Sequence, residues 1–191
     1  MEKNIKKKVA FLGPEGSYTH QVVKNHFDSI NFLYLSLNSI EDVFKTLNNK
    51  EADFGVVPSE NEIVGPIKIT HDCLDKYNLN IVTEIDMNIH HCFVSKVKNI
   101  ENIKSIYSHP SAYEQCKRFL DKNLFSGLNF VPTTSTSIAA KMSLKDKNSA
   151  AICSHVAAKI YNIPIMFKNI EDSSFNRTTF LVLSNFNYIS I

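Results

Sequence analysis

D-S-S-F-N-R-T-T-F-L-V-L, residues 172–183, is the stretch that decides the fold and where to search for a site. Its polar first half favours turns, whereas the apolar run from Phe180 to Leu183 predicts a buried strand. Two hydroxyls, Thr178 and Thr179, stand at the start of that strand, where side chains are held rigidly and can face a ligand. Thr178 is therefore our candidate proton donor, although threonine also suits the first residues of a strand for structural reasons alone.

Upstream of this stretch, apolar strand-like runs alternate with segments of helical periodicity. The alternation is typical of βαβ units and predicts an α/β fold with mainly parallel sheets. Pro58 is expected to end the strand that begins at Phe54, and the apolar positions between Ala112 and Leu120 predict one helix. Ser39 with Asp42 resembles a capping box and predicts the start of another helix. The other expected strands are Val9–Leu12, Phe32–Leu37, two between Ile81 and Ser95, Ser105–Tyr107, Asn129–Val131, Ala150–Cys153 and Ile165–Ile170.

Composition narrows the class of protein. With 191 residues, 43% of them hydrophobic, the chain can build the core of one domain or of two small lobes. No apolar run approaches the roughly 18 residues of a membrane span, and no signal-type stretch precedes the first strand, so we expect a cytoplasmic protein without membrane contact. The net charge of +2 gives no reason to expect nucleic acid as a partner, and Lys6–Lys8 is typical of a solvated tail. The four cysteines are widely spaced, which favours core positions over a zinc site or disulfides.

Two loops between a strand and a helix are candidate ligand sites. Ser17 and Thr19 follow the glycine-bearing loop after the first strand, where they can cap a helix or bind a carboxylate. Glu60, Asn61 and Glu62 follow another strand, at a position where open α/β sheets bind ligands. Acidic residues are also favoured near a helix N-terminus for structural reasons, so both interpretations of this run stay open.

The histidines indicate no metal site. His90 and His91 are expected within strands, where adjacent side chains point to opposite faces and cannot bind one metal together. His109 stands near a helix start, but no Ser or Cys nucleophile accompanies it in a suitable context, which favours a positioning role. Two glycines in the first loop are too few for a dinucleotide fingerprint, which requires a third glycine and a partner acid.

Six blocks together resemble the catalytic domain of the prephenate dehydratase family, in order and at similar spacing from Val9 to Leu183. They are F-L-G-P-E-G-S-Y-T-H, G-V-V-P-S-E-N-E-I-V-G, S-H-P-S-A-Y-E-Q-C, S-T-S-I-A-A, A-A-I-C-S-H-V-A-A-K-I-Y and N-R-T-T-F-L-V-L. The resemblance implies two α/β lobes arranged like a type II periplasmic binding protein, with the active site in the cleft between them. Residues 1–81 and 170–191 would form one lobe, and residues 82–169 the other.

The resemblance also implies a reaction. Prephenate loses its ring carboxylate as carbon dioxide and its ring hydroxyl as water, and aromatisation drives both losses, so neither a metal nor a cofactor is required. Thr178 matches the family's catalytic threonine. The other site residues within the blocks, all assigned to substrate binding, are Ser17, Thr19, Glu60, Asn61, Glu62, Ser111, Asn176, Arg177 and Thr179.

Assembly and regulation follow from the same resemblance. The family suggests a homodimer or a homotetramer. Its members often carry a C-terminal regulatory domain that binds phenylalanine, and this chain ends too soon for one. Feedback control by that route is therefore not expected.

Four block positions depart from the family pattern. Thr179 stands where the family usually has arginine, Glu62 where it has serine or threonine, Ser111 where it has glutamine, and Ser59 where it has an aliphatic residue. Arg177 lies two residues from Thr179, hence on the same face of an extended strand, and can replace part of the lost guanidinium–carboxylate contact.

Glu62 poses a problem of charge, because a carboxylate that faces a dianionic substrate is repelled unless it points outward, is protonated or meets a cation. The ammonium group of arogenate would be such a cation, which makes an arogenate dehydratase one alternative. A prephenate decarboxylase that leaves the ring non-aromatic is a second, and a non-catalytic module that binds a small acid is a third. Because Thr178 is present, dehydration of prephenate ranks first.

Overall fold

The computed structural model describes residues 6–186 and divides the chain into two compact units. Of the described residues, unit 1 takes 6–14, 18–88 and 176–186, and unit 2 takes Glu15–Ser17 and Ile89–Phe175. The chain leaves unit 1 after Asn88, and not near residue 81, because Asn88 still pairs with Arg177 in the sheet of unit 1. Residues 1–5 of the lysine-rich tail lie outside the described residues.

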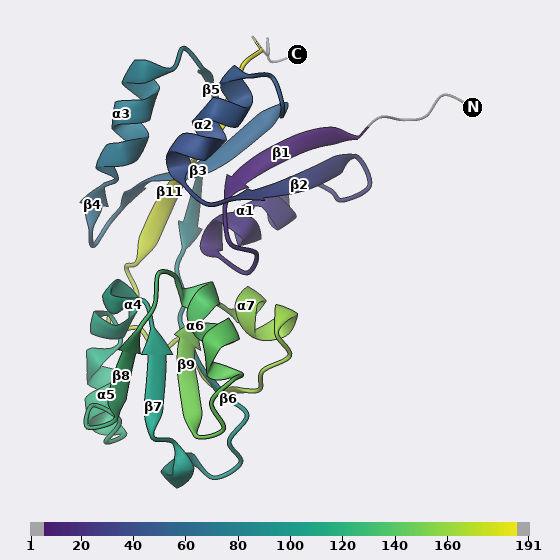
Figure 1. Ribbon diagram of the computed structural model, residues 1–191. Coiled ribbons are helices and arrows are strands. Elements are labelled where there is room, and N and C mark those ends of the chain that lie inside the picture. Colours follow the sequence, from purple (N-terminus) through teal and green to yellow (C-terminus); the bar gives the residue numbers. More distant parts are fainter. Residues whose placement is uncertain (1–5, 187–191) are drawn as a thin grey trace. The chain divides into compact units, whose positions relative to one another are not determined.

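Unit 1 is built on one mixed sheet (Figure 1). The strand order is β2 (Phe32–Leu37), β1 (Lys7–Leu12), β3 (Phe54–Asn61), β11 (Arg177–Ser184) and β5 (Asn80–Asn88), and the short β4 (Gly65–Pro66) pairs with β3. Strand β1 is parallel to both of its neighbours, whereas β11 is antiparallel to β3 and β5. Strand β11, which contains the apolar run Phe180–Leu183, therefore lies inside a sheet whose other strands come from the first half of the chain.

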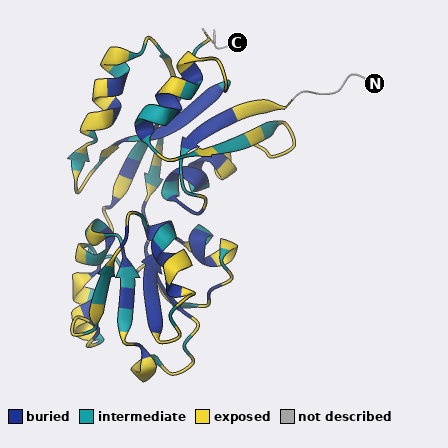
Figure 2. Cartoon of the chain, viewed as in Figure 1, coloured by how far each residue is buried: buried dark blue, intermediate teal, exposed yellow. Residues whose placement is uncertain are grey.

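Helices cover both faces of this sheet, and buried residues concentrate on its inner strands (Figure 2). Helix α1 (Tyr18–His26) packs on one face, where Val22 joins Phe11 and Phe180 in a core cluster. Helices α2 (Ile40–Asn48) and α3 (Lys68–Lys76) pack on the other, where Phe44 joins Leu181. Phe180 and Leu181 thus point to opposite faces, as alternation along a strand requires.

Unit 2 has a second mixed sheet, in the order β10 (Ile165–Lys168), β6 (Cys92–Ser95), β9 (Ser149–Cys153), β7 (Ser105–Ser108) and β8 (Asn129–Pro132). Its helical elements are η1 (Ile100–Asn102), α4 (Pro110–Glu114), α5 (Lys117–Lys122), α6 (Thr136–Ser143) and α7 (His155–Ile160). Phe93, Leu120 and Ile152 belong to the core cluster on one face, and Ala139 and Ala157 to the cluster on the other.

The predicted α/β class is confirmed, but the sheets are mixed and not mainly parallel. Strands β1, β2 and β3 pair in parallel through intervening helices, as do β7, β8 and β9. The antiparallel members β5, β6, β10 and β11 flank the segments through which the chain passes from one unit to the other.

The expected end of one strand and the expected extent of one helix are wrong. Strand β3 does not end at Pro58 but continues to Asn61, because the pairing with β11 shifts register there and a bulge accommodates the residue that cannot donate to the ladder. The single helix expected between Ala112 and Leu120 is broken into α4 and α5. Asp172 causes the break, since its N–H donates to the Gln115 carbonyl (2.7 Å) and its carboxylate accepts from the N–H of Arg118 (3.0 Å) at the start of α5.

Other local predictions are confirmed. Ser39 caps α2, with its Oγ accepting from the N–H of Asp42 at 3.0 Å. The four cysteines are all buried core residues. Within residues 6–186, no helix combines the length and the hydropathy that a membrane crossing requires.

Candidate active site at the start of the last described strand

The first residues of β11 present two different groups of side chains, one on each face of the sheet. Thr178 pairs with Asn61 of β3, and Thr179 pairs with Glu60 of β3 and Asp86 of β5. Since alternate residues of a strand point to opposite faces, Thr178 shares the face of Phe180 and helix α1, whereas Thr179 lies on the face of α2 and α3. The two consecutive threonines therefore cannot have the same role.

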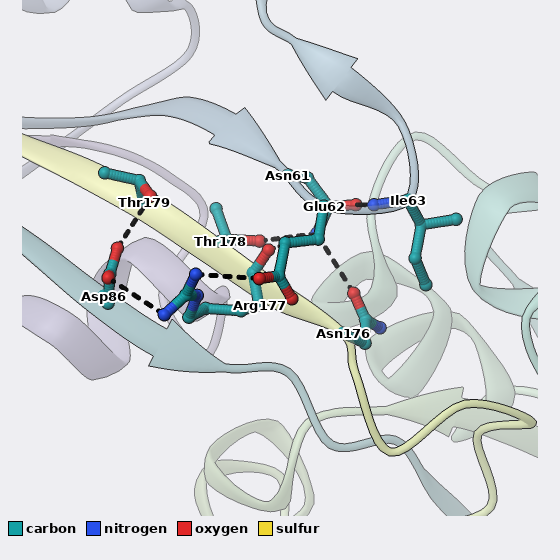
Figure 3. Close-up of polar contacts among 8 residues, drawn as sticks. All are labelled: Asn61, Glu62, Ile63, Asp86, Asn176, Arg177, Thr178 and Thr179. Atoms are coloured by element: carbon teal, nitrogen blue, oxygen red, sulfur yellow. Dashed lines mark hydrogen bonds and ion pairs between the residues drawn. The ribbon is translucent and has the colours of Figure 1, made fainter.

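Asn61 fixes the orientation of the Thr178 hydroxyl (Figure 3). The Oδ1 atom of Asn61 accepts from the backbone N–H groups of Ile63 (3.0 Å) and Val64 (3.1 Å), which can only donate. The Nδ2 group must therefore face Thr178, and it donates to Thr178 Oγ1 at 2.8 Å. Because Oγ1 is the acceptor in this bond, its own proton is left to donate to another oxygen.

Asn176 completes this group. Its Oδ1 accepts from Nδ2 of Asn61 at 3.0 Å, and the Arg177 carbonyl accepts from the same nitrogen at 3.1 Å. Asn176 is 2% exposed and Thr178 is 7% exposed. Hydrogen bonds are stronger in such a largely desolvated environment, which gives the Thr178 hydroxyl a well-defined direction.

The opposite face carries a group of charges at the same end of β11 (Figure 3). The Arg177 guanidinium lies 2.8 Å from the Glu62 carboxylate and 3.4 Å from the Asp86 carboxylate. The hydroxyl of Thr179 donates to Asp86 Oδ1 at 2.7 Å. Arg177 and Thr179 thus share a strand face, as their spacing predicts, and the cation that Glu62 requires is Arg177.

The β3 bulge accounts for another departure from the family pattern. Ser59 is the extra residue between Pro58, opposite Phe180, and Glu60, opposite Thr179. Its buried hydroxyl donates to the Thr179 carbonyl at 3.2 Å, a bond that an aliphatic residue cannot make. The neighbouring Glu60 is exposed.

The remaining predicted residues lie elsewhere in the fold. Thr19 is buried in α1 of unit 1, whereas Ser17 and Ser111 belong to unit 2. His109 caps α4, because its Nδ1 accepts from the N–H of Ser111 at 3.2 Å, and Gln115 Nε2 donates to the Ser111 hydroxyl at 3.3 Å. The positioning role expected for His109 is consistent with this cap.

Gln115 and His91 extend this hydrogen-bonded group. Oε1 of Gln115 accepts from Nε2 of His91 at 2.9 Å, and burial of His91 lowers the pKa of its imidazole. His90 and His91 lie in the connection between β5 and β6, not within a strand as expected, and a Glu171 carboxylate oxygen accepts from the N–H of His91 at 2.8 Å. Within residues 6–186, no three His, Cys, Asp or Glu side chains are grouped so that they could hold a metal ion.

Two residues near these groups were missed by sequence reasoning. Gln115 stands in the quoted block S-H-P-S-A-Y-E-Q-C, so a signal for it was present. Asp86 stands in no block, and only the pairing of β5 with β11 brings it to Arg177 and Thr179.

Comparisons with known proteins agree with these blocks. The family model described as prephenate dehydratase matches residues 9–187. Bifunctional chorismate mutase/prephenate dehydratases are similar, at 39% identity over 96% of this chain for the Aquifex aeolicus protein and 34% over 93% for the Pseudomonas aeruginosa protein. The chain spans only about half of each, 50% and 48% of their lengths.

Solved structures of prephenate dehydratases share the fold. The Arthrobacter aurescens enzyme, crystallised in complex with L-Phe, superposes with a TM-score of 0.84 at 26% identity, covering 93% of this chain and 60% of that one. The Staphylococcus aureus enzyme superposes with a TM-score of 0.80 at 26% identity, covering 94% of this chain and 66% of that one. On this evidence, the chain belongs to the prephenate dehydratase family.

Proposed function

We propose that this protein converts prephenate to phenylpyruvate, carbon dioxide and water, with Thr178 as the hydrogen-bond donor to the departing ring hydroxyl. One observation carries the proposal. The Asn61 amide donates to Thr178 Oγ1 at 2.8 Å and thereby directs the hydroxyl proton away from Asn61, toward an acceptor. A positioned acid of this kind is what loss of a poor leaving group such as hydroxide requires.

The reaction needs no other chemistry from the protein. The bond between the ring and its carboxylate breaks, and its electron pair forms a ring double bond as the carbon–oxygen bond to the hydroxyl breaks. The dianionic substrate takes up one proton and yields monoanionic phenylpyruvate, carbon dioxide and water. The hydrogen bond from Thr178 stabilises the charge that develops on the departing oxygen, and solvent supplies the net proton.

The ion pair between Glu62 and Arg177 supports prephenate over arogenate as the substrate. An ammonium group on the substrate is one way to neutralise Glu62, but Arg177 already lies 2.8 Å from its carboxylate. The charge problem that favoured arogenate is thus met within the protein. The other matched residues, Ser17, Thr19, Glu60, Ser111 and Asn176, are proposed substrate contacts.

Assembly and location are part of the same proposal. A homodimer or homotetramer in the cytoplasm is supported by family resemblance, and sedimentation of the purified protein would measure its assembly.

The test is the identity of the product. Purified protein is mixed with prephenate, and phenylpyruvate, carbon dioxide and loss of the ring diene are followed together. Phenylpyruvate with equimolar carbon dioxide supports the proposal. Carbon dioxide with a non-aromatic product would establish the decarboxylase instead, and binding without turnover would establish a binding module.

Thr178→Val tests the assigned residue, because valine keeps the branched shape and removes the hydroxyl. We expect kcat to fall by roughly 10²-fold or more, the contribution typical of a positioned acid. Thr83→Val is the matched control, since Thr83 is an exposed threonine of β5. Turnover by Thr178→Val close to that of this control would remove Thr178 from the mechanism.

A further inference from the structure

The loop Glu15–Ser17 belongs to unit 2, although it lies in sequence between two elements of unit 1. Strand β1 ends at Leu12 and helix α1 begins at Tyr18, and both are parts of unit 1. The chain therefore leaves unit 1 after Pro14 and returns three residues later. Contacts with residues of unit 2 must therefore hold this three-residue loop.

Two buried serines hold it through consecutive carbonyl groups. The hydroxyl of Ser137, in α6, donates to the Glu15 carbonyl, and the hydroxyl of Ser154, at the N-cap of α7, donates to the Gly16 carbonyl at 2.8 Å. Both serines are 0% exposed. Because water cannot reach these hydroxyls, no water molecule can replace either of them as the hydrogen-bond donor to its carbonyl group.

Gly16 shows how closely the loop approaches the helices. A Cβ at this position would lie 2.7 Å from Ser137 Oγ and 3.1 Å from the Cα of Ala157, and the φ angle of Gly16 is +85°. Both the close approach and the positive φ require glycine. Ser137, Ser154 and Ala157 thus form a surface that fits a bare backbone, which we call the loop seat.

We propose that Ser137 and Ser154 are positioning residues that hold the Glu15–Ser17 loop and so place the Ser17 hydroxyl for substrate binding. This inference rests on the proposed function through the assignment of Ser17 as a substrate contact. Ser17 directly follows the held Gly16, and it is 9% exposed. The loop seat also gives a role to the blocks S-T-S-I-A-A and A-A-I-C-S-H-V-A-A-K-I-Y, which supply no residue to the groups around Thr178.

The test uses Ser137→Ala and Ser154→Ala, each with a matched control. Ser143→Ala removes another buried hydroxyl of α6, one that donates to the Ala140 carbonyl and not to the loop. Ser135→Ala removes the N-cap of α6, as Ser154→Ala removes the N-cap of α7. The controls therefore measure the cost of a lost buried hydroxyl and of a lost helix cap.

Two readouts are compared in all four variants. We expect amide hydrogen exchange in residues 13–18 to accelerate in Ser137→Ala and Ser154→Ala, and KM for prephenate to rise by about 3- to 10-fold at nearly constant kcat, the effect of one net hydrogen bond. The control variants should leave both quantities as in the wild-type protein.

Unchanged exchange in residues 13–18 would overturn the loop seat. Faster exchange with an unchanged KM would overturn the positioning of Ser17. A wild-type protein that forms no phenylpyruvate would refute the proposed function instead, and the exchange comparison would still decide for or against the seat.

Discussion

The ion pair between Glu62 and Arg177 leads to a prediction that separates two roles for Arg177. If the guanidinium ties β11 to the turn after β3, removing the charge of Glu62 weakens folding and leaves substrate affinity unchanged. If the guanidinium binds a substrate carboxylate, removing that charge frees it and improves affinity. Because Arg177 lies 2.8 Å from Glu62 and 3.4 Å from Asp86, we expect the first outcome.

The expected fall in the free energy of unfolding depends on how exposed the ion pair is and on which charges each substitution leaves without a partner. The side chains of Arg177 and Glu62 are 49% and 41% exposed, and exposed ion pairs contribute about 0.2–1 kcal/mol to stability. Glu62→Gln leaves Arg177 its contact with Asp86, so we expect the free energy of unfolding to fall by about 0.5 kcal/mol. Arg177→Met leaves two neighbouring carboxylates without a cation, so we expect a fall of about 1 kcal/mol.

Urea unfolding of both single variants and the double variant gives the coupling energy, which should be about 0.5 kcal/mol and should shrink at high salt. Steady-state kinetics with prephenate should show KM for Glu62→Gln within about twofold of the wild-type value. Asp72→Asn is the control, because it breaks the exposed ion pair with Lys68 on α3, which involves no residue of β11. A several-fold fall in KM for Glu62→Gln would refute the structural role and make Arg177 a substrate contact.

Two further predictions concern stability. Burial lowers the pKa of His91 below its ordinary value of 6.5. Below pH 6.5 the unfolded chain therefore binds a proton at His91 more readily than the folded protein does. The stability that neutral His91 contributes is fully present above pH 6.5 and is lost as the pH falls below 6.5. Urea midpoints between pH 7.5 and 5.5 should decline less steeply for His91→Gln than for the wild-type protein, and equal slopes would contradict this. Gly55→Ala should lower the free energy of unfolding by about 1–3 kcal/mol, because the added Cβ would lie 2.5 Å from Leu47 Cδ1 and 2.9 Å from Val43 Cγ1. Unchanged urea unfolding of Gly55→Ala would show that α2 yields to the methyl group without cost.

Local patterns predicted the elements of the fold, and distant segments decided what those patterns missed. The apolar alternation identified the strands, and Ser39 with Asp42 identified the start of α2, because both signals lie within a few residues. The break between α4 and α5 depends on Asp172, which approaches Arg118 only in the folded protein. No pattern near Gln115 indicates that break.

In the candidate site too, the sequence predicted several of the residues that belong to it, whereas the contacts between distant segments could not be predicted. The blocks identified Thr178 and Asn61, but not that the Asn61 amide orients the Thr178 hydroxyl, because the bond joins strands that are far apart in sequence. The charge of Glu62 was recognised as a problem, and its solution required the pairing of β3 with β11. The roles in catalysis and substrate binding assigned to Thr178 and Asn61, and to Ser17, Thr19 and Ser111, stay predictions.

The interior position of β11 has a consequence for how the protein is made. Strands β3 and β5 gain their shared neighbour only when Arg177–Ser184 has been translated, after the whole of Ile89–Phe175. On the ribosome, β3 therefore keeps one unpaired edge, and β5 has no partner strand, while unit 2 is synthesised. Unpaired edges invite association with other chains, so this order of synthesis exposes the protein most during the time that separates β5 from β11.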